Sequence, residues 1–145
     1  MDIRRITDDF YAAPQIGVED LAEIAACGIR VVLCNRPDEE VPPSHQSQTI
    51  GAAAQAAGLT FVVLPLAHHN MTPEVIRANH NHINGGDAPV LAYCASGTRS
   101  TIAWALGQAG MMSTEQIVTA AARGGYDLRN IQPTLEAIAR NTTLG

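Results

Sequence analysis

Three short runs of apolar residues, separated by stretches with helical periodicity, constrain the fold of this 145-residue chain most strongly. They lie at residues 29–34, 59–66 and 89–93. Each run is largely apolar instead of alternating regularly with polar residues, which is typical of a strand covered on both faces. This alternation of strands and helices predicts an α/β fold: a single three-layer domain with a mostly parallel central sheet and helices on both faces.

Helix-start and helix-stop signals fill the segments between the runs. Thr72 followed by proline is a typical helix start, Ser113 to Gln116 forms a capping-box pattern, and Gly28 and Gly58 are typical stops. We expect a short extended piece at 11–16 and helices at about 18–28, 44–57, 72–84, 99–109, 113–124 and 133–140. No repeat or linker interrupts the pattern, so residues 1–145 are interpreted as one domain.

Composition excludes several classes of function. A net charge of −5 argues against a dedicated nucleic-acid binder, which normally carries a basic face. No apolar run approaches membrane-spanning length, and the charged first residues do not resemble a secretory signal, so we expect a cytoplasmic protein. Three cysteines, none in a Cys-x-x-Cys pair, indicate neither a disulfide framework nor a zinc site. We expect no metal and no organic cofactor.

The segment 90–104 is predicted to form a strand, a loop and a helix, with Cys94 at the carboxyl end of the strand. Parallel sheets bind ligands at this edge. Gly97 allows a tight turn with inward-pointing N–H groups, the following helix directs its positive end at the loop, and Arg99 can grip an oxyanion with two donors. All three effects favour a thiolate. A buried structural cysteine is the alternative, but the coincidence of Cys, Gly and Arg makes Cys94 the predicted nucleophile. Arg99 is then a catalytic anion-binding residue, and the anion-binding loop comprises Ala95, Ser96, Gly97 and Thr98.

The motif at 93–100, Tyr-Cys-Ala-Ser-Gly-Thr-Arg-Ser, resembles the active loops of tyrosine and dual-specificity phosphatases and of rhodaneses. Nearly the whole chain resembles one bacterial group, the phosphatase-like domain of beta-lactamase hydrolase-like proteins, also described as a sulfur transferase family. The matching segments are Pro14-Gln15, 31–39, 58–65 and the Cys94 loop. The resemblance implies a dual-specificity-phosphatase-like α/β domain, Cys94 as nucleophile and Arg99 as anion-binding residue. It also implies a persulfide dioxygenase as a fused or separate partner in sulfide metabolism.

The length of the loop bears on the reaction. Four residues separate Cys94 from Arg99, whereas the phosphatases of this type have five and the rhodanese loops resemble the shorter version. Phosphate-ester cleavage also benefits from a general acid, and the segment 67–72 that would supply it has no Asp. The sequence therefore favours a rhodanese-type sulfurtransferase acting through a Cys94 persulfide. The alternative is a phosphatase acting through a Cys94 phosphocysteine, and a non-catalytic module that binds phosphorylated or sulfated ligands is a third hypothesis.

Neighbouring residues refine these hypotheses. Ala95 stands where many rhodanese loops have Arg, which favours a persulfide over thiosulfate as the donor. Ser100 is expected either to cap the helix or to hydrogen-bond the Cys94 sulfur as a catalytic residue. His68 and His69 are expected to line the pocket, with either standing in for the acid, and Asp38 is a remote candidate for that role.

Two further residues, Arg36 and Cys34, each have two possible roles. Arg36 is expected to pair with Asp38 or Glu39, or to add positive potential at the pocket rim. Cys34 is interpreted as a small buried apolar residue, with a protective disulfide to Cys94 as the alternative. The expected substrate is a small anion: thiosulfate, a persulfide or a phosphate ester. The sequence determines neither which of these it is nor the oligomeric state.

Overall fold

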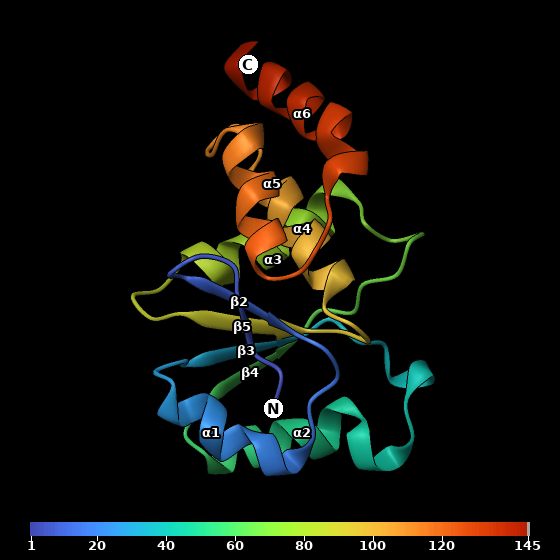
Figure 1. Ribbon diagram of the computed structural model, residues 1–145. Helices are drawn as coiled ribbons and strands as arrows, with labels where there is room; N and C mark the ends of the chain where they lie inside the picture. Colours follow the sequence, from blue (N-terminus) through green and yellow to red (C-terminus); the bar gives the residue numbers. More distant parts are fainter. Residues whose placement is uncertain (145) are drawn as a thin grey trace.

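A five-stranded sheet runs through the middle of the molecule in the computed structural model, which describes residues 1–144 (Figure 1). The strand order is β1-β2-β5-β3-β4. The first strand pairs antiparallel with the second, and all other neighbours are parallel. The strands are β1 (Arg4–Arg5), β2 (Phe10–Ala13), β3 (Val31–Cys34), β4 (Thr60–Val63) and β5 (Val90–Tyr93).

Helices cover both faces of the sheet, so the predicted three-layer α/β architecture is confirmed. Figure 1 shows α1 (Leu21–Ala26) and α2 (Ser47–Ala56) below the sheet. The other helices lie above it: α3 (Pro73–Asn84), α4 (Thr98–Gln108), α5 (Thr114–Arg123) and α6 (Gln132–Leu144). Short 3-10 turns are η1 (Val18–Asp20), η2 (Asp38–Glu40), η3 (Pro43–His45) and η4 (Arg129–Ile131). Within the described residues, no helix is long and apolar enough to cross a membrane.

The pleat of the central strands explains why their sequences are continuously apolar. Along β3, Val32 and Cys34 pack toward α1 and α2, whereas Leu33 packs toward the α3–α6 side. On β5, Leu91 and Tyr93 also pack toward α1 and α2. Because side chains alternate between the two faces and each face is buried, every position must be apolar.

The expected helix starts are confirmed at two positions. The Thr72 hydroxyl accepts the Val75 N–H at 3.3 Å, and proline occupies the next position. Ser113 and Gln116 form the reciprocal capping box predicted from the sequence. The start of α2 was predicted wrongly, because this helix begins at Ser47 instead of Ser44.

Two strands differ from expectation. The two-residue strand β1 was not predicted, because so short a segment carries no periodicity. The run at 59–66 forms β4, which is an edge strand, and its Val63 is 46% exposed. It was therefore predicted wrongly as fully buried, since position within a sheet depends on strand order, which apolar character alone does not reveal.

Candidate active site

The carboxyl end of β5 leads directly into the loop predicted to bind anions. Cys94 is fully buried and continues the pairing with the neighbouring strand, because its N–H donates to Ala13 O at 3.4 Å. The loop then turns into α4, whose first residue is Thr98. First-turn amides of a helix have no intrahelical acceptor, so this end of α4 presents free donors and a positive dipole to the loop.

Three successive carbonyl groups of the loop are held pointing outward. Ala95 O accepts the Gln15 N–H at 3.2 Å, and Ser96 O accepts the Tyr126 hydroxyl at 2.9 Å. Gly97 O accepts both the N–H and the hydroxyl of Thr101, at 3.0 and 2.8 Å. In a trans peptide the N–H points away from the carbonyl, so the contacts of Ala95 O and Ser96 O direct the Ser96 and Gly97 amides inward, whereas the Thr98 N–H donates to Ser96 Oγ at 3.3 Å. The Gly97 N–H accordingly donates to Cys94 Sγ at 3.1 Å.

Gly97 is required by this geometry. Its φ of +94° lies in the left-handed region that favours glycine. A Cβ at this position would also lie 2.0 Å from the Tyr126 hydroxyl oxygen. The other loop side chains are exposed, and the Ser96 hydroxyl donates to Thr98 Oγ1 at 2.9 Å. They shape the loop, whereas the backbone supplies the donors.

The Arg99 guanidinium is fixed beside the sulfur by a carboxylate that the sequence analysis did not identify. Its Nη1 donates to Glu40 Oε2 at 2.9 Å and to Leu66 O at 2.8 Å, and its Nη2 donates to Glu40 Oε1 at 2.7 Å. This two-pronged contact with Glu40, and more weakly the charge of Cys94, raise the pKa of Arg99. The group is therefore a permanent cation.

Arg36 belongs to the same cluster. Its Nε donates to Glu40 Oε1 at 3.0 Å and its Nη1 to Gln15 Oε1 at 3.3 Å. The predicted pairing of Arg36 with Asp38 or Glu39 was therefore wrong, because η2 turns Glu40 toward both arginines. The two guanidinium groups share one carboxylate, so the cluster keeps one net positive charge beside Cys94. The contact with Arg99 holds the pKa of Glu40 below its ordinary value.

Ser100 lies next to the loop but its hydroxyl is committed elsewhere. It donates to Asn35 Oδ1 at 2.8 Å, so the hydrogen bond to the Cys94 sulfur considered from the sequence is not formed here. Asn35 in turn donates to Asn79 Oδ1 at 2.9 Å and to Leu64 O at 2.8 Å. These buried side chains join α4, the end of β3 and α3 into one satisfied polar network, which fixes the start of α4.

The residues considered as general acid are either exposed or bound to another partner. His68 and His69 are exposed and, within residues 1–144, neither forms a hydrogen bond or ion pair. The Asp38 carboxylate accepts both the N–H and the hydroxyl of Ser47, at 2.7 and 2.8 Å, and so holds the start of α2. The described residues also contain no group of three or more His, Cys, Asp or Glu side chains suited to a metal ion.

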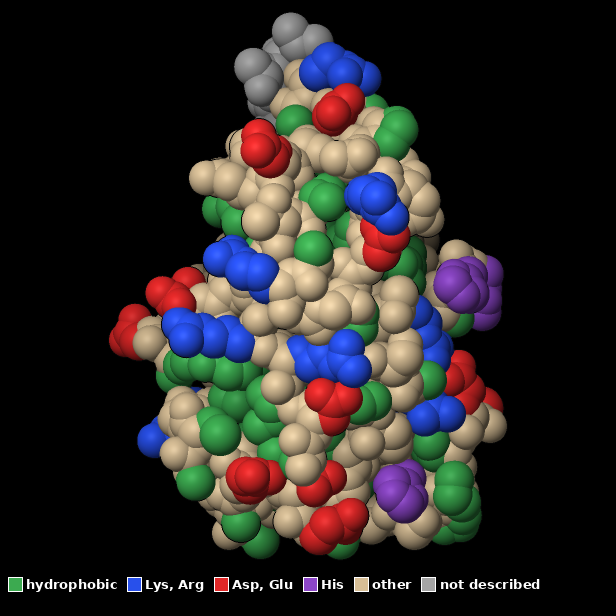
Figure 2. Space-filling model, viewed as in Figure 1, with side chains coloured by type: hydrophobic (Ala, Val, Ile, Leu, Met, Phe, Trp, Pro, Cys, Tyr) green, Lys and Arg blue, Asp and Glu red, His purple; other side chains and the backbone are tan. Residues whose placement is uncertain are grey.

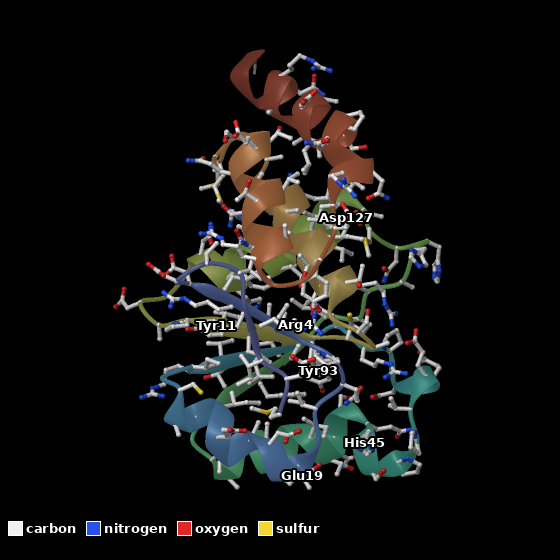
Figure 3. All side chains as sticks on the ribbon, in the orientation of Figure 1. Arg4, Tyr11, Glu19, His45, Tyr93 and Asp127 are labelled. Atoms are coloured by element: carbon white, nitrogen blue, oxygen red, sulfur yellow. The ribbon has the colours of Figure 1, made fainter. Side chains whose placement is uncertain are left out.

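The alternation of side chains along the strands argues against a disulfide between Cys34 and Cys94. Cys34 is paired in register with Tyr93, and both side chains face α1 and α2, where Figure 3 places Tyr93. Cys94 is the next residue along the chain, so its side chain points away from that face. Both cysteines are free thiols, and burial raises the pKa of Cys34. Cys34 is therefore a buried structural residue in this structure.

The surface agrees with the charge balance of the sequence. Figure 2 shows arginine and acidic side chains interspersed over the visible face, with no broad field of one sign. The positive charge that matters is local and lies in the Arg36, Glu40 and Arg99 cluster.

Comparison with known proteins gives consistent matches. Residues 2–111 match the model of a family described as the phosphatase-like domain of beta-lactamase hydrolase-like proteins. A beta-lactamase hydrolase-like protein from Agrobacterium fabrum is 29% identical over 126 residues, covering 86% of this chain and 29% of the relative. The chain thus spans about a third of the length of such relatives.

Solved structures extend the likeness. A candidate phosphatase from Neisseria meningitidis is 29% identical, with a TM-score of 0.83, and the match covers 95% of this chain and 99% of that one. The Pseudomonas aeruginosa protein TpbA, solved in complex with phosphotyrosine, is 11% identical, with a TM-score of 0.68 over 99% of this chain and 91% of that one. At this low identity the second likeness shows the fold alone: that of the tyrosine and dual-specificity phosphatases.

Proposed function

We propose, from the premise that this chain belongs to the phosphatase-like domain family of the beta-lactamase hydrolase-like proteins, that it is an enzyme that cleaves small phosphate esters with Cys94 as nucleophile. One observation carries the proposal: the Gly97 N–H lies 3.1 Å from Cys94 Sγ, within a loop whose carbonyls are bound outward and beside the fixed Arg99 cation. Donors that favour a thiolate also favour the oxyanion of a group bound to it.

The reaction proceeds in two steps. The Cys94 thiolate attacks phosphorus, so that an S–P bond forms while the bond to the leaving-group oxygen breaks and that oxygen takes a proton from water. Water then attacks phosphorus, the S–P bond breaks, inorganic phosphate leaves and the thiolate is restored. The loop amides and Arg99 hold the phosphoryl oxygens throughout, and they need no rearrangement because they are already in place.

The absence of a placed acid among residues 1–144 limits the substrate. Asp38 is occupied at the start of α2, Glu40 is held by two arginines, and His68 and His69 are exposed. Without assisted protonation, esters with acidic leaving groups, such as aryl phosphates, should react much faster than alkyl phosphates.

Sulfur transfer is the second candidate, favoured by the four-residue spacing between Cys94 and Arg99 and by the same lack of a placed acid. In that reaction the thiolate attacks a sulfane sulfur, the donor leaves as sulfite or a thiolate, and an acceptor thiol or cyanide removes the sulfur from the Cys94 persulfide. The fold and relatives support the phosphatase reading better, since one neighbour is a candidate phosphatase and another was solved with bound phosphotyrosine. A persulfide dioxygenase partner stays a prediction from the resemblance.

The deciding experiment supplies the purified protein with p-nitrophenyl phosphate, with thiosulfate and cyanide, and with glutathione persulfide. We expect steady nitrophenol release and, on rapid quenching, an adduct of one phosphoryl group on Cys94. An adduct of one sulfur atom with rapid transfer to cyanide or a thiol, and no nitrophenol release, would instead establish sulfur transfer.

Cys94→Ser should lower either turnover by at least about a thousandfold, because the hydroxyl is a far weaker nucleophile than the thiolate. Cys27→Ser, at an exposed free cysteine, is the matched control and should leave turnover unchanged. If Cys94→Ser turned over as fast as the wild type, Cys94 could not be the nucleophile. Retained phosphate binding with no turnover in the wild type would indicate the non-catalytic module.

A further inference from the structure

The peptide group between Ser96 and Gly97 is bound on both of its sides. Its carbonyl oxygen accepts the Tyr126 hydroxyl at 2.9 Å, while its N–H donates to Cys94 Sγ at 3.1 Å. The two contacts lie on opposite sides because the group is planar and trans. A hydroxyl that fixes the oxygen therefore also fixes the direction of the N–H.

This peptide group can rotate more easily than the others in the loop. Gly97 adopts a positive φ, and glycine occupies positive and negative φ with similar ease. If the peptide rotated by half a turn, the carbonyl oxygen would face the sulfur and repel both a thiolate and a bound oxyanion. The flanking carbonyls of Ala95 and Gly97 are held by backbone amides, whereas Ser96 O is held by one side chain.

Tyr126 is itself firmly placed. It is 5% exposed, and Arg4 lies over its ring with the guanidinium carbon 5.2 Å from the ring centre. Arg4 Nη1 also donates to Gly124 O at 3.1 Å, which ties the segment after α5 to β1. Burial raises the pKa of Tyr126, so the phenol keeps the proton that it donates. Tyr126 lies beyond residues 2–111, the part matched by the family model.

We infer that Tyr126 is a positioning residue whose hydroxyl holds the Ser96–Gly97 peptide with its N–H toward Cys94, and that Arg4 supports it. The inference rests on the proposed role of Cys94 as nucleophile. The role of Tyr126 is nevertheless distinct from the phosphatase activity: the segment after α5 controls the reactivity of the Cys94 thiol without touching the substrate.

The test is the rate of Cys94 alkylation by iodoacetamide as a function of pH, followed by intact mass. Tyr126→Phe keeps the ring under Arg4 and removes only the hydroxyl. We expect its rate-against-pH curve to move to higher pH, with the rate at neutral pH falling about fivefold, as expected for one lost hydrogen bond. The rate at high pH should not fall. The charged groups that face the loop, Arg99 and behind it Glu40, are unchanged.

Tyr11→Phe is the matched control. Tyr11 lies on β2, labelled in Figure 3, and packs toward α1 and α2, so its curve should coincide with that of the wild type. Arg4→Met changes a partly exposed side chain and leaves the hydroxyl in place, so it should shift the curve in the same direction by about twofold. Thermal unfolding confirms that each variant is folded.

Wild-type curves for a folded Tyr126→Phe would overturn the inference. If Tyr126→Phe did not fold, a wild-type curve for Arg4→Met would overturn it equally. Because alkylation needs no substrate, the two proposals fail separately. A shifted curve in a protein that releases no nitrophenol supports Tyr126 and contradicts the phosphatase proposal. An unshifted curve in a protein that releases nitrophenol contradicts the role of Tyr126 and supports the phosphatase proposal.

Discussion

Two loops meet at the carboxyl edge of the sheet, and they are built very differently. In the Cys94 loop three consecutive carbonyls are hydrogen-bonded outward and the arginine at its end makes three charged or carbonyl contacts. The facing loop at 67–72 is held through Asn70, which accepts the Ala67 N–H at 2.8 Å and donates to Pro65 O at 3.0 Å. Its two histidines are exposed and, within the part of the chain described, have no hydrogen-bonding partner.

This difference indicates that the site is built to stabilise charge at the nucleophile and not to protonate the leaving group. Groups that must stabilise charge at the nucleophile are rigid, which is the arrangement that contributes most to rate. Among the described residues, no comparably fixed group is available to protonate a leaving oxygen. The site should therefore be strong at binding and receiving a transferred anion, and weak at expelling a poor leaving group.

After Cys94→Ser, the largest effect in the Cys94 loop is expected from Arg99→Lys. Lysine keeps the positive charge but cannot make the two-pronged contact that fixes Arg99 on Glu40, so kcat/KM for p-nitrophenyl phosphate should fall about a hundredfold. Arg129→Lys, at an exposed arginine paired with Asp127, is the matched control and should have no effect. A loss of less than about threefold for Arg99→Lys would mean that charge alone, not fixed geometry, matters.

Glu40→Gln tests whether the carboxylate behind Arg99 contributes through position. We expect kcat to fall about tenfold without a rise in KM, because the arginine is less fixed but its charge is less offset. Glu39→Gln, on the exposed neighbour, should behave as wild type. An unchanged kcat for Glu40→Gln would show that Leu66 O alone suffices to place Arg99.

The same residue predicts a pH dependence. The pKa of Glu40 is lowered from its ordinary 4.5, because Arg99 stabilises the charged form. A lowered folded-state pKa contributes stability that is present above pH 4.5 and is lost as the pH falls through the folded-state pKa. Thermal unfolding of wild type should therefore lose stability over this acid range more steeply than that of Glu40→Gln. Parallel profiles would contradict this assignment.

The smallest effect is expected in the facing loop. His68→Ala and His69→Ala should each change kcat/KM for p-nitrophenyl phosphate by less than about twofold, since both side chains are exposed and, within the described residues, no contact fixes them. The same variants assayed with an alkyl phosphate sharpen the comparison. A selective loss of more than about tenfold on the alkyl ester would show that one histidine moves in as the acid, and the contrast between the loops would then hold only before substrate binds.

Much of this architecture could be predicted from local pattern. Largely apolar runs indicated parallel strands, and Ser113 and Thr72 marked helix starts, because these signals depend on residues a few positions apart. The errors concern position within the sheet and pairing across loops. Asp38 illustrates this: it was considered as an acid, but it holds the start of α2 through Ser47, nine residues further along the chain.

Sequence alone determined that Cys94 follows a strand and precedes a helix, that four residues separate it from Arg99, and that a glycine allows the turn between them. Tertiary structure decided the rest of the site. The partner of Arg99 is 59 residues away, that of Ser100 is 65 away, and Tyr126 reaches Ser96 across 30 residues. Backbone conformation is fixed largely by neighbouring residues, whereas side-chain partners depend on which loops the parallel crossovers bring to one edge of the sheet.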